Sequence, residues 1–115
     1  MTIPPEILGL VEKLTQELNR IEQRANEGLV LTRQLLERFP NNARLIDLSA
    51  NLGNVLFFIS SLRNRIENII QKISGNSVSI EAIQEASEEL SEFGGRILEC
   101  KMSVNRSVSL LENLQ

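Results

Sequence analysis

The side chains that most often do chemistry in proteins are scarce in this chain of 115 residues. It contains no histidine, no tyrosine and no tryptophan, and its single cysteine is Cys100. Without histidine, no Ser-His or Cys-His pair can activate a nucleophile and no Glu-x-x-His motif can bind a metal in a helical bundle. No glycine-rich loop follows a strand to hold phosphate. An enzyme is therefore the function class that the sequence supports least.

Cys100 has two interpretations. It falls on the apolar seam of its expected helix, where a cysteine behaves as a small buried hydrophobic residue. A reactive thiol would instead need an exposed, electropositive setting. We favour the buried residue, and a single cysteine also suits a reducing compartment because it cannot form an internal disulfide.

The expected location is cytoplasmic. The first residues lack the basic start and the apolar run of a signal peptide. The longest uncharged run lies between Asp47 and Arg63, which is too short to span a bilayer comfortably. We therefore expect no membrane segment.

Five glutamates form an acidic face on the first half of the last expected helix: Glu81, Glu85, Glu88, Glu89 and Glu92. A carboxylate metal site is one interpretation, but such sites in bundles point inward and usually include histidine. The alternative is that the glutamates pair with Arg63, Arg65 and Lys72 on the neighbouring helix and fix its orientation. We favour interhelical charge pairing, and we expect no metal and no cofactor.

Basic side chains on the first two expected helices could share one height: Lys13, Arg20, Arg24, Arg63 and Arg65. Glutamates are interspersed among those of the first helix, and the net charge of the chain is −3. Binding of nucleic acid through its phosphates depends on clustered Lys and Arg. We therefore expect a solvated face of mixed charge rather than a nucleic-acid site.

Three helices would carry these residues. In each of them apolar or small residues recur at alternating steps of three and four, which is the period of a helix that buries one seam. The middle seam has no interruption: Leu45, Leu48, Leu52, Val55, Ile59, Leu62, Ile66, Ile69 and Ile73. The first seam runs from Ile7 to Phe39, and the third runs from Ile83 to Leu114.

Short segments mark where the helices begin and end. Pro4-Pro5 starts the first helix, and two segments separate it from the second and the second from the third: Phe39-Pro40-Asn41-Asn42, and Gly75-Asn76 followed by Ser79. Proline suits a first helical turn and disfavours helix in the residue before it, and an Asn or Ser can cap the helix that follows. The expected helices cover residues 5–39, 43–74 and 79–114.

Connections this short make consecutive helices antiparallel. The sequence thus predicts an all-α fold, an elongated antiparallel up-down-up three-helix bundle that forms a single domain over residues 1–115. Gly94 and Gly95 lie inside the third helix, where each costs about 1 kcal/mol relative to alanine. The seam keeps its phase across the pair, so we expect one helix, with a bend or a break at the pair as alternatives.

Apolar and small residues also occur on faces that should be polar: Ile46, Ala50, Gly53 and Phe57 in the second helix, and Gly95, Leu98 and Met102 in the third. At about 1.5 Å per residue, both sets are expected near the height of Leu29–Leu31 in the first helix. A wide core would absorb Leu29, Leu31 and Phe58. It accounts poorly for Phe57, because Phe57 and Phe58 cannot both point at one seam. We favour an outward contact surface.

The favoured function is a non-catalytic protein–protein interaction module that self-associates as a dimer through these seven residues. It would serve as a scaffold, an adaptor or a small subunit of a larger assembly. One alternative is a chaperone-like member of a hetero-complex that binds a partner's helix. The other alternative is a weak nucleic-acid-binding accessory protein that uses the basic residues of the first two helices.

Overall fold

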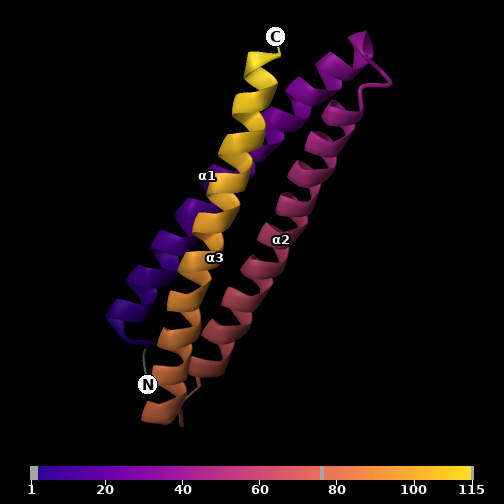
Figure 1. Cartoon of the computed structure of the whole chain (residues 1–115). Helices are drawn as coiled ribbons and strands as arrows, with labels where there is room; N and C mark the ends of the chain where they lie inside the picture. The colour runs from indigo at the N-terminus through magenta and orange to yellow at the C-terminus, as the bar shows by residue number, and fades with distance from the viewer. Residues whose placement is uncertain (1–2, 76, 115) are drawn as a thin grey trace.

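The structure is a computed structural model that describes residues 3–75 and 77–114, and these residues form three long helices (Figure 1). They are α1 (Pro5–Arg38), α2 (Ala43–Ile73) and α3 (Ile80–Asn113). Each helix end lies within one residue of the end expected from the sequence. Asn76, the second residue of the predicted stop after α2, lies outside the described residues, as do the first two residues and the last residue of the predicted domain.

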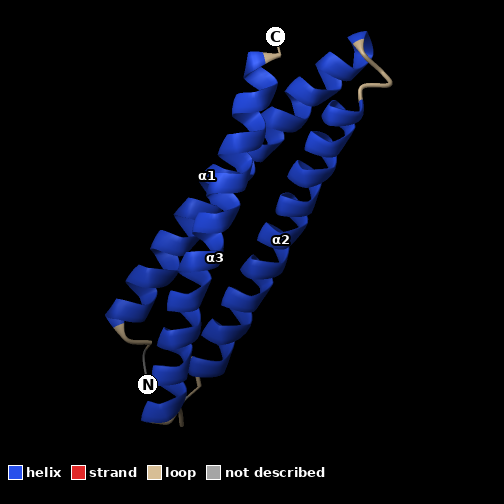
Figure 2. Cartoon of the chain, in the orientation of Figure 1, coloured by secondary structure: helices blue, strands red, loops and turns tan. Residues whose placement is uncertain are grey.

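The helices run up, down and up, and each packs against the other two along a body of 59 × 17 × 16 Å. Figure 2 shows that short loops join them at opposite ends of the body. The start of α1 and the end of α3 also lie at opposite ends of the body (Figure 1). The predicted all-α, elongated three-helix bundle is confirmed.

Side-chain caps begin α2 and α3. Asn42 Oδ1 accepts a hydrogen bond from the backbone N–H of Leu45 at 3.1 Å, and Ser79 Oγ accepts one from the backbone N–H of Ala82 at 3.1 Å. These bonds satisfy N–H groups that have no partner within the helix. Of the two asparagines before α2, Asn42 is therefore the cap.

The core consists of the predicted seams, and all nine seam residues of α2 are buried. Two predicted seam residues at helix ends are exposed instead, Phe39 and Leu114. Phe39 follows the last residue of α1 and has φ −131° and ψ 67°, because the proline after it disfavours the helical conformation. Leu114 likewise follows the last residue of α3, so neither side chain reaches the core.

The three helices approach closely at Gly28. A Cβ atom at Gly28 would lie 2.9 Å from Leu52 Cδ1 and 2.9 Å from Val108 Cγ2. Val108 is not on the predicted seam of α3, yet it is buried. The missing side chain of Gly28 leaves the space that Val108 fills.

Polar side chains join α2 and α3 near the level of Gly28. Asn51 Nδ2 donates hydrogen bonds to Ser103 Oγ at 3.1 Å and to Ser107 Oγ at 2.9 Å. Thr32, which is buried in α1, donates to the carbonyl oxygen of Gly28 at 2.7 Å. Every buried side-chain nitrogen and oxygen of the described residues has a partner. Because losing a buried partner costs about 1–3 kcal/mol, the two bonds of Asn51 fix the register of α2 against α3.

The glycine pair does not break α3, which is continuous from Ile80 to Asn113. A Cβ atom at Gly94 would lie 3.9 Å from Leu14 Cδ2, whereas a Cβ at Gly95 would meet nothing within 4 Å. Buried residues precede and follow the pair on the seam. Packing against α1 and α2 therefore holds the helix together despite the low helix propensity of glycine.

Candidate functional site

The α2 stripe, defined as Ile46, Ala50, Gly53 and Phe57, is exposed along its whole length. Phe57 is 80% exposed and Ile46 is 51% exposed. A Cβ atom at Gly53 would meet nothing within 4 Å. Phe58, by contrast, is partly buried and packs against the core. A wide core accounts for Phe58 but not for Phe57.

The α2 stripe lies on the side of α2 that borders α1. Arg63 and Glu67 of α2 line a groove together with residues of α1, and Arg63 Nη2 lies 3.3 Å from Glu22 Oε1 of α1. Gly53 and Ile46 precede Glu67 by two and three heptads, so they share its face. The stripe therefore runs beside α1 rather than beside α3.

Apolar residues of α1 extend this surface. Gly28 faces Leu52, so Val30 is level with the middle of the α2 stripe. Val30 is 50% exposed, and Leu29 is partly buried against the core. Leu29 follows Glu22, the partner of Arg63, by one heptad and therefore lies on the α2 flank of α1, whereas Val30 lies on the outer face of α1.

The α3 stripe, defined as Gly95, Leu98 and Met102, is also exposed, but it lies on the other side of α1. Leu98 lines a groove between α1 and α3 that also contains Leu10 and Lys13. The structure therefore does not bring the α2 and α3 stripes together.

The two stripes also differ in height. Gly94, next to the α3 stripe, faces Leu14, whereas Leu52, inside the α2 stripe, faces Gly28. Leu14 and Gly28 are about 20 Å apart along α1. At its other end, however, the α3 stripe reaches Met102, beside Ser103, which accepts a hydrogen bond from Asn51 within the range of the α2 stripe. The expected overlap in height therefore holds at Met102 only, and Gly95 and Leu98 lie further from Leu29–Leu31 than expected.

The predicted charge pairing between α2 and the acidic face of α3 does not form. Four ion pairs join the described residues: Arg20–Glu17, Arg24–Glu112, Arg63–Glu22 and Arg96–Glu92. Arg63 turns toward α1 because it occupies the α1 flank of α2, and Glu92 pairs within its own helix. Lys72 lines a groove with Glu85 and Glu89, although no ion pair joins them within 4 Å among the described residues. Arg63 therefore lies on the other flank of α2 from the one predicted, whereas Lys72 lies on the predicted flank without forming an ion pair.

The basic residues are divided between sides as well. Lys13, Arg20 and Arg24 line grooves between α1 and α3, whereas Arg63 lies between α1 and α2. Arg20, Arg24 and Arg63 each lie within 4 Å of a glutamate. The arrangement is a surface of mixed charge rather than one basic patch.

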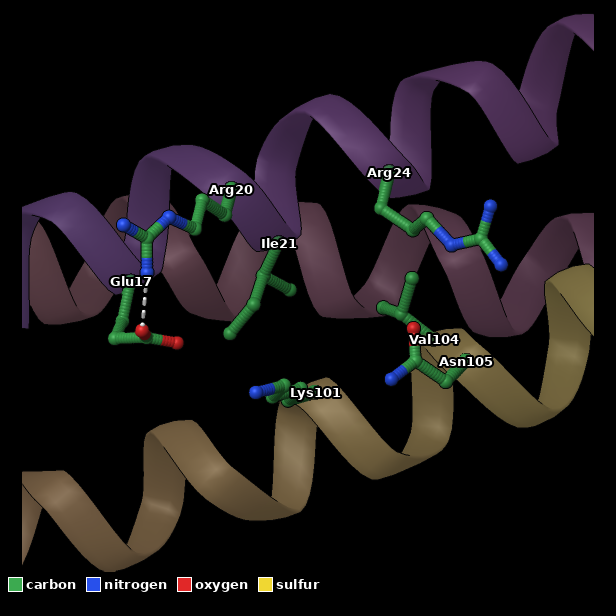
Figure 3. A pocket seen from close by; sticks show the side chains of 7 residues that line it. All are labelled: Glu17, Arg20, Ile21, Arg24, Lys101, Val104 and Asn105. Atoms are coloured by element: carbon green, nitrogen blue, oxygen red, sulfur yellow. Dashed lines mark hydrogen bonds and ion pairs between the residues drawn. The ribbon is translucent and has the colours of Figure 1, made fainter.

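Between α1 and α3 there is a shallow pocket of about 160 Å³ (Figure 3). It is lined by Glu17, Arg20, Ile21, Arg24, Lys101, Val104 and Asn105. Arg20 Nη1 lies 2.7 Å from Glu17 Oε1, and Arg24 Nη2 lies 3.7 Å from Glu112 Oε1. Lys101, which the sequence analysis did not single out, adds a third cation from α3. Ligand pockets usually have volumes of about 300–1,000 Å³, so this one is smaller than a typical ligand site.

Cys100 is buried in the core. Burial raises the pKa of its thiol above the ordinary value of 9.0, and the neighbouring Glu99 carboxylate raises the pKa further. The described residues contain no group of three or more His, Cys, Asp or Glu side chains that could hold a metal ion. Cys100 therefore lacks both the exposure and the positive surroundings of a reactive thiol.

The reactivity of Cys100 gives a testable prediction. We expect an aromatic disulfide reagent to label the folded protein slowly at pH 8, and to label it at the rate of an unstructured thiol in urea, as followed by absorbance. The unfolded state loses the thiol proton first as the pH rises. The free energy of unfolding should therefore fall as the pH rises above about 9, and Cys100→Ala should remove that part of the slope. Rapid labelling of the folded protein would contradict burial of the thiol.

By length and composition α2 could cross a membrane, and it is the one described helix that could. The same composition is common in core helices of soluble proteins, and nine residues of α2 are buried against α1 and α3. Asn51 of this helix also bonds to two serines of α3. The bundle therefore accounts for the apolar inner face of α2, and the outer face remains as the α2 stripe.

Likeness to known proteins adds no assignment for these surfaces, so a function must be argued from the surfaces themselves. The chain matches no protein-family description, no curated protein and no solved structure.

Proposed function

We propose that this protein is a non-catalytic interaction module that self-associates through the α2 stripe. It would act as a scaffold, an adaptor or a small subunit of a larger assembly in the cytoplasm. The observation that carries the proposal is Phe57, which is 80% exposed in the middle of a helix. Full burial of a phenylalanine side chain stabilises a protein or a complex by about 1.5–3 kcal/mol, and an exposed apolar patch usually marks a contact with a partner.

The surroundings of Phe57 support the same proposal. The chain is uncharged from Leu48 to Leu62, so no charge has to be removed from water when the stripe is covered. Gly53 and Ala50 have little or no side chain next to Phe57, so a second helix can approach α2 closely there.

The α3 stripe belongs to the proposal as a separate contact. Gly95, Leu98 and Met102 lie beside α1 on its other flank, and the centre of this stripe is about 15 Å further along the bundle. A single flat partner could not cover both stripes without crossing α1. A partner on the α3 stripe would also meet Lys101 and Lys13, so that contact should depend on salt, whereas contact at the α2 stripe should not.

The alternative is a hetero-complex in which the α2 stripe binds a helix of another protein. The same apolar surface with small side chains suits such a helix. Under this alternative the purified chain stays monomeric at every concentration, whereas self-association makes its apparent mass depend on concentration. Nucleic-acid binding has less support, because Lys13, Arg20 and Arg24 lie on a different side of the bundle from Arg63.

Replacing Phe57 with aspartate tests the proposal. Loss of a central apolar contact costs about 2 kcal/mol or more, and a two-fold dimer contains Phe57 twice. We therefore expect Phe57→Asp to raise the dissociation constant by several hundred-fold, at about 1.4 kcal/mol per factor of ten. Size-exclusion chromatography with light scattering over a dilution series measures the change.

Ile80 provides a matched control, because it is 79% exposed at the start of α3 and lies outside both stripes. Ile80→Asp removes a comparable exposed apolar side chain and adds the same charge, so it should leave the apparent mass unchanged. A wild-type protein that remains monomeric up to millimolar concentration would refute self-association. So would equal effects of the two substitutions.

A further inference from the structure

The side-chain sizes in the α2 stripe follow the same order when the stripe is read from either end. A large residue, two small residues and a large residue follow one another at steps of four, three and four: Ile46, Ala50, Gly53 and Phe57. An antiparallel second copy reverses this order and still matches it. Ile46 then lies opposite Phe57 of the second copy, and Ala50 lies opposite its Gly53. In a two-fold interface every contact occurs twice, with residue i against j and j against i, and the symmetric order makes the two members of each such pair similar in size.

The sizes of these residues fit two crossing helices. Helices that cross at an angle are closest at the crossing point and diverge on either side of it. Ala50 and Gly53 would lie at the crossing point, where small residues permit close approach, and the space at Gly53 is open. Ile46 and Phe57 would lie on either side, where the gap is wider and larger side chains fill it.

Residues of α1 fit the same axis. Gly28 of α1 faces Leu52, which lies between Ala50 and Gly53 in the sequence. Val30 is therefore close to the height of the two-fold axis, and it is half-exposed. A second copy related by this axis would bring α1 toward its own counterpart at the height of Leu29 and Val30, which are both apolar.

The area available is sufficient for a stable contact. The proposed axis lies about 10 Å from the middle of α2, so two bodies 59 Å long would overlap over about 40 Å. Across a width of 17 Å, a shallow crossing of about 20° gives at most about 700 Å² per copy, near the roughly 800 Å² per partner of a standard interface. A crossing point near either end of the bundle would leave much less.

Charges do not oppose this register. The axis makes α2 overlap its counterpart over residues 43–60, and in this range the charged side chains are Arg44 and Asp47, which have opposite signs. The charges that follow, beginning with Arg63, lie beyond the start of α2 in the second copy. No like charges are therefore opposed between the two α2 helices.

We infer that the α2 stripe binds a second copy of this chain, antiparallel, with a two-fold axis that passes between Ala50 and Gly53. The inference rests on the proposed self-association and adds the identity, direction and register of the partner helix.

Distances between spin labels test the register. Asn54 and Asn68 are both exposed and lie two heptads apart on one face of α2, beside the stripe rather than on it. Each is replaced singly by cysteine in a Cys100→Ala background, labelled, and measured by pulsed electron paramagnetic resonance in the full chain. At 1.5 Å per residue the antiparallel dimer should give a distance below about 20 Å for Asn54→Cys and about 50 Å for Asn68→Cys. Helicity and apparent mass of both variants are checked first.

The outcomes separate this inference from the proposed function. A dimer that gives two similar distances has parallel α2 helices, and a dimer that gives two long distances uses another surface. Either result overturns the inference; the first leaves self-association through the stripe in place. A chain that stays monomeric in light scattering overturns the proposed function itself. A short distance for Asn54→Cys and a long one for Asn68→Cys support both the inference and the proposed function, provided that adding Phe57→Asp abolishes them and adding Ile80→Asp does not.

Discussion

Truncation of Leu52 to alanine is expected to lower the free energy of unfolding by about 3–5 kcal/mol, toward the upper end for leucine-to-alanine changes in a core. Leu52 is fully buried, and it packs where α1, α2 and α3 approach one another at Gly28. The polar bonds of Asn51 hold α2 and α3 in place beside it, so the cavity cannot close easily. Urea unfolding followed by circular dichroism at a fixed protein concentration measures the loss.

Leu8→Ala is the matched control for Leu52→Ala. Leu8 is half-exposed on α1, and substitutions at exposed positions usually change stability by less than about 0.5 kcal/mol. Similar losses for the two variants would mean that Leu52 is not packed as the structure describes.

Gly28→Val is expected to cost about 3 kcal/mol, at the upper end of the usual cost of adding atoms to a packed core. A Cβ atom alone would lie 2.9 Å from both Leu52 Cδ1 and Val108 Cγ2, and valine adds two further methyl groups. Leu52 and Val108 are themselves buried, so neither side chain can move out of the way. The midpoint of urea unfolding should fall, with little change in its slope.

A double-mutant cycle shows whether the cost arises at this contact. In a Leu52→Ala background the valine at position 28 gains space, so its cost should be smaller by about 1 kcal/mol or more. Gly9→Ala is the control for helix propensity, because a Cβ at Gly9 meets nothing within 4 Å. It should stabilise the protein by up to about 1 kcal/mol. Additive effects in the cycle would contradict the close approach at Gly28.

The alternating steps of three and four predicted the core because burial of one seam is what imposes that period. The same rule failed at Phe39, where the proline after it ends the helix although the spacing continues. It also missed Val108, whose burial depends on a glycine some eighty positions away in the sequence. Periodicity describes each helix alone, so contacts created by an absent side chain on another helix do not appear in it.

The candidate site was predictable in part. Heptad positions indicated that Phe57 would point away from the seam, and its exposure agrees with this. The sides were not predictable, because a heptad pattern does not say which neighbour lies on which flank. Arg63 therefore turns to Glu22 rather than to the glutamates of α3, and Leu98 lies in the groove between α1 and α3 rather than beside the α2 stripe. The position of each stripe along the bundle was not predictable either. It depends on the contacts at Gly28 and Gly94, and the lengths of the loops do not determine those contacts.

Because the bundle has three long helices, an odd number, its first and last helical residues are far apart. α1 begins at one end of a body 59 Å long and α3 finishes at the other. Anything attached to the two ends would be held apart by a stiff rod of that length, and tension between them would act along the helix axes. Tension of this kind loads all three seams in shear at once, so the bundle should resist stretching far better than it resists peeling of α1 or α3 from one side.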